Sequence, residues 1–124
     1  MRALVADDDP VVTTVIAAAL MRDGWRVTTV HDAMQAIMFA GRTPAPDVIV
    51  LDLSMPAGTG FHALQRLKAS TKTAQIPVVI LTGSDDPDAP QRVKSLGAQA
   101  FVTKPVDPNE FAQYIASVVP PNAS

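Results

Sequence analysis

A buried strand that ends in a carboxylate constrains this chain more than any other feature. Residues 48–51 are Val-Ile-Val-Leu, and an aspartate stands on either side of them. A continuous run of β-branched residues and leucine is typical of a strand buried on both faces, as in a parallel sheet. Asp52 follows this run directly, where burial of a carboxylate is costly unless a positive charge compensates for it. The sequence therefore predicts that other residues near the exit of this strand accommodate Asp52.

Short apolar runs alternate five times with segments of helical periodicity. The runs predict strands at residues 3–6, 26–30, 48–51, 77–82 and 100–102. This alternation is typical of an α/β domain with a parallel sheet and right-handed crossovers. The length of 124 residues and the 48% of apolar residues fit one domain with one core. We assign residues 1–119 to this domain and residues 120–124, which begin with two prolines, to a C-terminal tail.

Capping residues indicate where the helices begin. Asp9-Pro10 and Asp107-Pro108 each place a carboxylate before a proline at the first helical position, and Asp32 precedes a further helix. The start of the fourth helix stays open between Asp86 and Asp88. In the first helix, apolar residues at helical spacing predict an inward face, made of Val12, Val15, Ile16, Ala19 and Leu20.

Polar residues end or follow four of the five predicted strands. The carboxyl ends of parallel strands form the usual ligand site of such sheets, so these side chains are expected to meet: Asp7, Asp8, Asp9, Asp52, Thr82 and Lys104. Clustered carboxylates repel one another unless a cation intervenes, and oxygen donors suit Mg²⁺. With Mg²⁺ and Lys104 beside it, Asp52 stays ionised and can accept a phosphoryl group as a nucleophile.

Four segments carry a family resemblance. They lie in a fixed order at the predicted strand exits: residues 5–9 (Val-Ala-Asp-Asp-Asp), residues 51–56 (Leu-Asp-Leu-Ser-Met-Pro) with Gly60, residues 80–83 (Ile-Leu-Thr-Gly) and residues 101–105 (Phe-Val-Thr-Lys-Pro). In this combination the chain resembles a response-regulator receiver domain (CheY-like) of two-component signalling. The resemblance implies a flavodoxin-like (βα)5 fold, a doubly wound five-stranded parallel sheet of order 2-1-3-4-5.

The resemblance also implies roles for particular residues. Asp52 matches the phosphorylated aspartate, and Lys104 and Thr82 match the lysine and the switch hydroxyl that act on the phosphoryl group. Phe101 matches the aromatic switch residue on strand five. The Mg²⁺ ligands match Asp8, Asp52, the backbone carbonyl of Ser54 and, through water, Asp7.

The implied partners follow from this chemistry. The phosphoryl group comes from a sensor histidine kinase or a histidine phosphotransfer protein. Phosphorylation then changes the surface of strand five and its flanking helices, where a downstream protein partner binds. Turnover is limited to self-phosphorylation and self-dephosphorylation, so the domain is not expected to be an enzyme.

Two other functions remain open from the residues. Asp7-Asp8-Asp9 contains an Asp-x-Asp pattern after the first strand, as in Mg²⁺-dependent phosphatases with an aspartyl nucleophile that are similar to haloacid dehalogenases. No segment for substrate recognition is visible in the sequence. The other alternative is a receiver-like binding module that works without phosphorylation. Such modules typically lack one of the acids or the lysine, whereas Asp7, Asp8, Asp52 and Lys104 are all present.

Charge and composition exclude several classes. The net charge of −2 provides no electrostatic basis for binding nucleic acid. The absence of cysteine excludes disulfides and cysteine-ligated zinc. No apolar run approaches the ~20 residues of a membrane span, and acidic residues follow the first apolar run too soon for a signal peptide. We therefore expect a cytoplasmic protein that binds no membrane.

Overall fold

Five parallel strands and five helices alternate along the chain, as the sequence predicts. The computed structural model describes residues 1–55 and 59–119; the expected tail, 120–124, and Pro56 of the motif after Asp52 lie outside these residues. The elements are β1 (Arg2–Ala6), α1 (Pro10–Arg22), β2 (Arg26–Val30), α2 (Ala33–Ala40), β3 (Val48–Leu51), α3 (Gly60–Ala69), β4 (Val78–Thr82), α4 (Ala89–Ser95), β5 (Ala100–Thr103) and α5 (Pro108–Val118).

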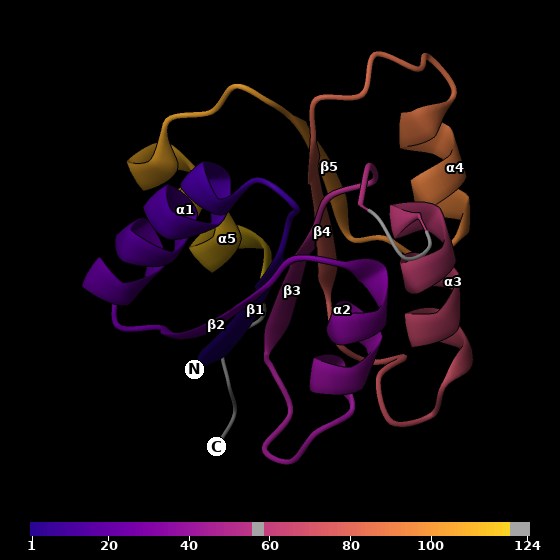
Figure 1. Cartoon of the computed structure of the whole chain (residues 1–124), viewed down its shortest axis with the longest axis horizontal. Coiled ribbons are helices and arrows are strands. Elements are labelled where there is room, and N and C mark those ends of the chain that lie inside the picture. The colour runs from indigo at the N-terminus through magenta and orange to yellow at the C-terminus, as the bar shows by residue number, and fades with distance from the viewer. Residues whose placement is uncertain (56–58, 120–124) are drawn as a thin grey trace.

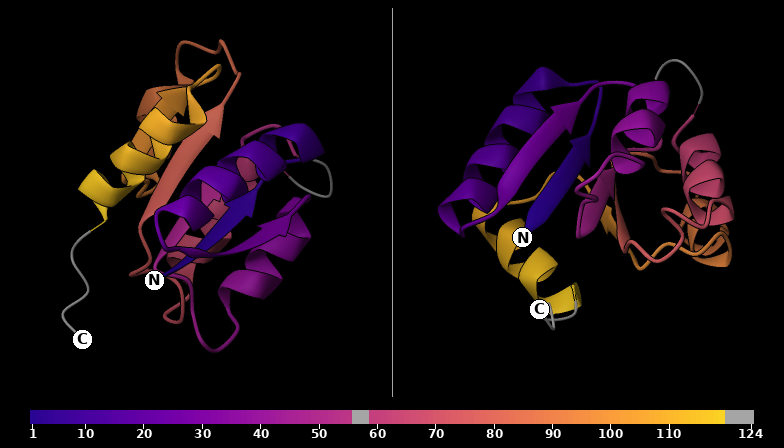
Figure 2. Two further views of the ribbon diagram at one scale, coloured as in Figure 1. Left: turned by 90° about the vertical axis from the view of Figure 1, so that its left-hand side faces the viewer. Right: turned by 90° about the horizontal axis from the view of Figure 1, so that it is seen from below.

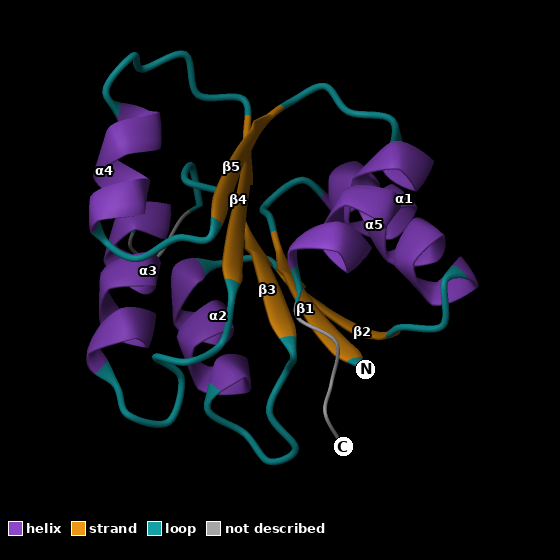
Figure 3. Cartoon of the chain, turned by 180° about the vertical axis from the view of Figure 1, so that it is seen from behind, coloured by secondary structure: helices purple, strands orange, loops and turns teal. Residues whose placement is uncertain are grey.

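The strand order is β2-β1-β3-β4-β5, which confirms the doubly wound order 2-1-3-4-5. Helices cover both faces of the sheet, with α1 and α5 on one side and α2, α3 and α4 on the other (Figures 1 and 3). The register aligns Ala6 with Leu51 and Leu51 with Ile80. The exits of β1, β3 and β4 therefore lie next to one another at one edge.

Two hydrophobic clusters fill the space between the sheet and its helices. Side chains alternate between the faces of a strand, so Leu4 and Ile49 contribute to the cluster under α2, α3 and α4, whereas Ala3 and Val48 contribute to the cluster under α1 and α5. Every residue of β3 is buried, as expected for the central strand. The domain thus has a hydrophobic cluster on each side of the sheet, and not the single core expected from its length, because the sheet separates the two faces.

The prediction for the inward face of α1 was wrong at one position. Val15 is 42% exposed, and the buried residues of this helix are Thr13, Ile16, Ala17, Ala19 and Leu20. The buried face is centred on Ile16 and Leu20, which turns Val15 toward solvent. Thr13 tolerates burial because its hydroxyl donates to the Pro10 carbonyl at 3.1 Å.

The predicted caps are present at three helices. Asp9 accepts the N–H of Val11 at 2.9 Å, Asp32 accepts that of Gln35, and Asp107 accepts two N–H groups of α5. Helix α4 begins after Asp88, which settles the choice between Asp86 and Asp88 for its start, although the Asp88 side chain makes no capping bond.

Helices α1 and α5 lie side by side (Figure 2), and the Arg22 side chain of α1 donates a hydrogen bond to Asn109 of α5 at 2.6 Å.

Gly60 allows α3 to begin directly against the strand exit that carries Asp52. Its N–H donates to the Leu53 carbonyl at 3.0 Å. A Cβ atom on Gly60 would lie 2.2 Å from the Asp52 carbonyl oxygen and 2.4 Å from the Leu53 Cα, which is closer than atoms can approach. The absence of a side chain at Gly60 therefore allows the start of α3 to lie against the backbone at the end of β3.

We expect Gly60→Ala to destabilise the domain by roughly 2 kcal/mol or more, because backbone must move to admit the methyl group. The measurement is urea unfolding followed by fluorescence of Trp25, the single tryptophan, which is buried under α1 and α5. Gly83→Ala is the matched control, since a Cβ there meets no atom within 4 Å. Equal unfolding midpoints for the two variants would contradict the steric argument.

Candidate functional site

The backbone of two acidic residues is held by an extension of the sheet. Beyond the end of β1, the N–H of Asp7 donates to the Val30 carbonyl at 3.1 Å. Beyond the end of β3, the N–H of Asp52 donates to the Ala6 carbonyl at 3.0 Å. Because these bonds continue the parallel ladder by one residue, both side chains emerge at fixed positions on the carboxyl edge.

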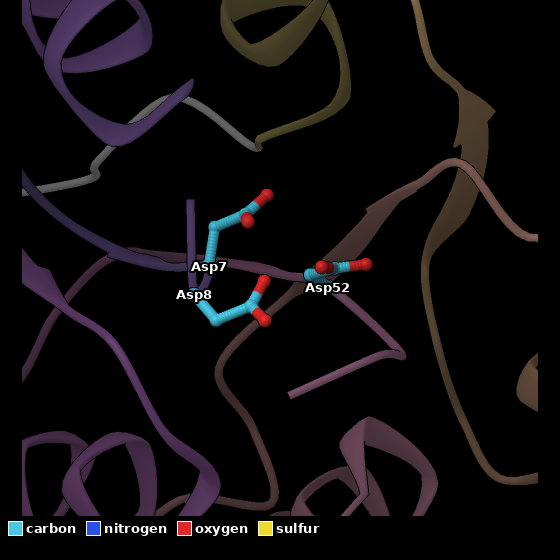
Figure 4. A group of neighbouring side chains, drawn as sticks. All are labelled: Asp7, Asp8 and Asp52. Atoms are coloured by element: carbon cyan, nitrogen blue, oxygen red, sulfur yellow. The ribbon is translucent and has the colours of Figure 1, made fainter. Parts of the chain in front are cut away.

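Three carboxylates meet at this edge. Asp7, Asp8 and Asp52 each offer one oxygen, and these oxygens lie within 4.8 Å of one another (Figure 4). Asp7 is 2% exposed and Asp52 is 4% exposed, whereas Asp8 is exposed to solvent. Hard oxygen donors at this spacing, with one open to solvent, fit a small divalent cation such as Mg²⁺.

Lys104 brings a positive charge into the acidic cluster. Its Nζ lies 2.6 Å from Asp7 Oδ2 and 3.7 Å from Asp52 Oδ2. The backbone N–H of Lys104 donates to the Thr82 carbonyl at 2.9 Å, which extends the pairing of β4 and β5. The sequence predicted Lys104 beside Asp52, but in the structure its shorter contact is to Asp7.

Burial and charge act in opposite directions on these groups. Burial raises the pKa of the Asp7 carboxyl, and the charge of Asp52 adds to this, although hydrogen bonds from Lys104 and from the Asp9 N–H lower it in part. For Lys104, burial lowers the pKa, but the hydrogen bond to Asp7 and the charges of Asp52, Asp7 and Asp9 outweigh it and raise the pKa overall. Lys104 is therefore held in its charged form, and Asp7 ionises less readily than a solvated aspartate.

Comparison with known proteins identifies the family of this chain. The family model of the response regulator receiver domain matches residues 3–116. The chain belongs to the response regulator receiver family. Two-component response regulator ORR8 of Oryza sativa subsp. indica is 41% identical over 103 residues, which cover 83% of this chain and 85% of that protein. Receiver domains of this family are signalling modules that work through phosphorylation.

Solved receiver structures share the fold. The chemotaxis response regulator CheY4 of Vibrio cholerae has 26% sequence identity and a TM-score of 0.86, covering 94% of this chain and 97% of its own. The receiver domain of the sensor histidine kinase PA1611 from Pseudomonas aeruginosa, solved with a magnesium ion in its active site cleft, has 28% identity and a TM-score of 0.84. It covers 95% of this chain and 96% of its own.

The other predicted site residues have different surroundings. Thr82, the last residue of β4, is fully buried, and its Oγ1 accepts the N–H of Ser84 at 3.3 Å. Phe101 on β5 is half-buried and packs against the cluster under α2, α3 and α4. Ser54 is exposed and directs its N–H to Asp52 Oδ1 at 3.4 Å.

Two residues support the site in ways that sequence patterns did not indicate. The His31 Nδ1 lies 3.0 Å from the Asp7 carbonyl, so this exposed side chain covers the turn after β1. Gly60 contacts the Asp52 backbone, as described above. The place of Gly60 in the motif after Asp52 was the available signal, whereas nothing in the sequence placed His31 against Asp7. None of the helices in residues 1–55 and 59–119 has the length and apolar character of a membrane span.

The raised pKa of Asp7 gives a prediction for stability. Between the ordinary aspartate value of 3.8 and the higher folded-state pKa, the folded protein keeps a proton that the unfolded chain has lost. Stability therefore falls as pH rises through this window, and the cost persists at neutral pH. We expect Asp7→Asn to raise the Tm by a few degrees at neutral pH without divalent cations, and by less at acid pH.

Differential scanning calorimetry at both pH values provides the measurement. Asp85→Asn is the control, because Asp85 is exposed and its side chain has no hydrogen bond or ion pair to the described residues. A lower Tm for Asp7→Asn at neutral pH would show instead that the ion pair with Lys104 outweighs the burial of the carboxylate.

Proposed function

We propose that Asp52 is the phosphoacceptor of this receiver domain and that Asp7, Asp8, Lys104 and Thr82 serve the same reaction. The observation that carries the proposal is the environment of Asp52: a carboxylate that is 4% exposed, with two further carboxylates on one side and the Lys104 Nζ at 3.7 Å. A buried carboxylate kept beside a cation in this way has the properties of an activated nucleophile.

The proposed Mg²⁺ site consists of Asp8, Asp52 and the backbone carbonyl of Ser54, with Asp7 acting through water. The donor set supports it, since three carboxylates with oxygens within 4.8 Å of one another suit a divalent cation in addition to Lys104. When bound, Mg²⁺ neutralises negative charge on the carboxylates and on the oxygens of the phosphoryl group. The exposure of Asp8 leaves the site open to solvent.

The proposed donor is a sensor histidine kinase or a histidine phosphotransfer protein. A carboxylate oxygen of Asp52 forms a bond to phosphorus while the bond between phosphorus and the donor histidine nitrogen breaks, and the electron pair stays on that nitrogen. Lys104 stabilises the charge on the transferred group, and the Thr82 hydroxyl donates a hydrogen bond to it. The buried position of Thr82 at the end of β4, adjacent in the sheet to β3 and to Lys104, supports this role.

The proposed output is a change at the β5 face. Phe101 is half-buried beside residues of α4 and α5, and pockets of about 220 and 540 Å³ flank it on these two sides. The space in these pockets supports a change of the Phe101 rotamer when Thr82 moves toward the phosphoryl group. A downstream protein partner would then bind the altered surface of β5, α4 and α5.

The position of Asp9 favours a signalling domain over a phosphatase. In the phosphatase alternative, Asp9 would be the second acid of the Asp-x-Asp pattern. Its carboxylate instead accepts the N–H of Val11 and caps α1, outside the group formed by Asp7, Asp8 and Asp52. We therefore propose that the domain supports its own phosphorylation and dephosphorylation only.

The domain limits of 1–119, the cytoplasmic location and the absence of nucleic-acid binding stay predictions.

The direct test is incubation with Mg²⁺ and acetyl phosphate, followed by mass spectrometry of the intact protein. We expect one added phosphoryl group on the wild type and none on Asp52→Asn, which keeps the shape of the side chain but removes the nucleophile. Asp9→Asn is the matched control and should be phosphorylated like the wild type. Multiple-turnover hydrolysis of phosphate esters that is lost in Asp9→Asn would establish the phosphatase, and the absence of both adduct and Mg²⁺ binding would establish the passive module.

A further inference from the structure

A pocket with two arginines lies at the amino end of the sheet, opposite the acidic cluster. It has a volume of about 230 Å³, and we call it the basic pocket. Its lining includes Arg2, Arg26, Thr28, Phe39, Pro44 and Pro46. Ligand sites for drug-sized molecules are typically ~300–1,000 Å³. The basic pocket is smaller, so it suits a small ligand or part of a larger one.

The two arginines are placed side by side by the sheet. Arg2 of β1 and Arg26 of β2 are register partners in neighbouring parallel strands, which are spaced ~4.8 Å apart. Both side chains lie on the face covered by α2, because they alternate with Ala3 and Val27, which pack on the opposite face. Two guanidinium groups at this spacing can bind the oxygens of one anion together.

Neither guanidinium group is neutralised by the described part of the chain. The two ion pairs found among the described residues are both made by Lys104. Within this part of the chain, no carboxylate therefore lies within 4.0 Å of the Arg2 or Arg26 guanidinium group. Asp47 is also at this end of the sheet, but its Oδ2 accepts the backbone N–H of Arg2 at 2.7 Å. The positive charge of the pocket is therefore available to a ligand.

The other side of the basic pocket is apolar. Phe39 of α2 lines the pocket, and the guanidinium carbon of Arg42 is 4.0 Å from the centre of its ring. Pro44 and Pro46 of the loop before β3 complete this wall. A cationic side and a flat apolar side favour a ligand that joins an anionic group to a ring.

We propose that the basic pocket binds a small phosphate monoester that carries a flat ring, of the class of the nucleoside monophosphates. The phosphate lies between Arg2 and Arg26, and the ring packs against Phe39 and the two prolines. A phosphate monoester carries two negative charges and so matches the charge of two arginines. A single carboxylate carries one negative charge and does not. The five residues of β1 separate this site from Asp7 by roughly 17 Å, so binding does not involve the acidic cluster.

Titration of the ¹⁵N-labelled protein with AMP, in EDTA to remove divalent cations, tests this proposal by NMR. We expect AMP to cause chemical-shift changes at Arg2, Arg26, Thr28 and Phe39. Adenosine and inorganic phosphate should each bind more weakly than AMP. Arg26→Gln should weaken AMP binding by about tenfold, because one charge-assisted contact is lost. Arg66→Gln is the control: Arg66 is exposed on α3, outside the pocket, and its loss should change nothing.

Asp52→Asn separates this proposal from the phosphoacceptor function. AMP binding that is unchanged in Asp52→Asn supports the basic pocket whether or not Asp52 is phosphorylated. The proposal is overturned if millimolar AMP causes no shifts, if the shifts centre on Asp7 and Asp8, or if Arg26→Gln and Arg66→Gln bind AMP like the wild type. Inorganic phosphate that binds as tightly as AMP would overturn the role of the ring.

Discussion

Lys104 and Asp7 are 97 residues apart in the chain, yet the ammonium of one lies 2.6 Å from the carboxylate of the other. This contact offsets part of the cost of burying acidic side chains at the carboxyl edge of the sheet. Asp7 and Asp52 are almost completely buried and share the edge with Asp8, so without a cation their mutual repulsion and loss of hydration would oppose folding. One lysine compensates for only part of this charge, and the remaining negative charge supports the proposed site for a divalent cation.

The parallel sheet determines which residues meet at this edge. Asp7 and Asp52 are each one residue beyond a strand, and their N–H groups continue the hydrogen bonding of the sheet. Lys104 is anchored in the same way, through its N–H to the Thr82 carbonyl. A backbone held so firmly orients the side chains before any ligand arrives, which is the preorganisation that charge stabilisation needs. Gly60 contributes by letting α3 begin against Asp52 without displacing it.

Much of this was predictable because strand periodicity and capping are local properties of a sequence. The β3 run predicted a central strand, and the order of the acidic, threonine and lysine segments predicted the family and hence the strand order. Details that depend on packing between distant elements were not predictable. Helical spacing alone could not show that α1 turns Val15 to solvent, and Lys104 was expected at Asp52 although its shorter contact is to Asp7. The contacts of His31 and Gly60 with the acid-bearing turns likewise depend on tertiary structure.

The most direct test of the central claim is the Mg²⁺ affinity of three proteins, measured by isothermal titration calorimetry at neutral pH. Asp8 is exposed, so Asp8→Asn removes one proposed ligand without disturbing the core. We predict that this variant binds Mg²⁺ at least ~10-fold more weakly than the wild type. Asp9→Asn, one residue away and outside the carboxylate group, should bind Mg²⁺ nearly as well as the wild type. A wild type that binds no Mg²⁺, or equal affinity in all three proteins, would contradict the account.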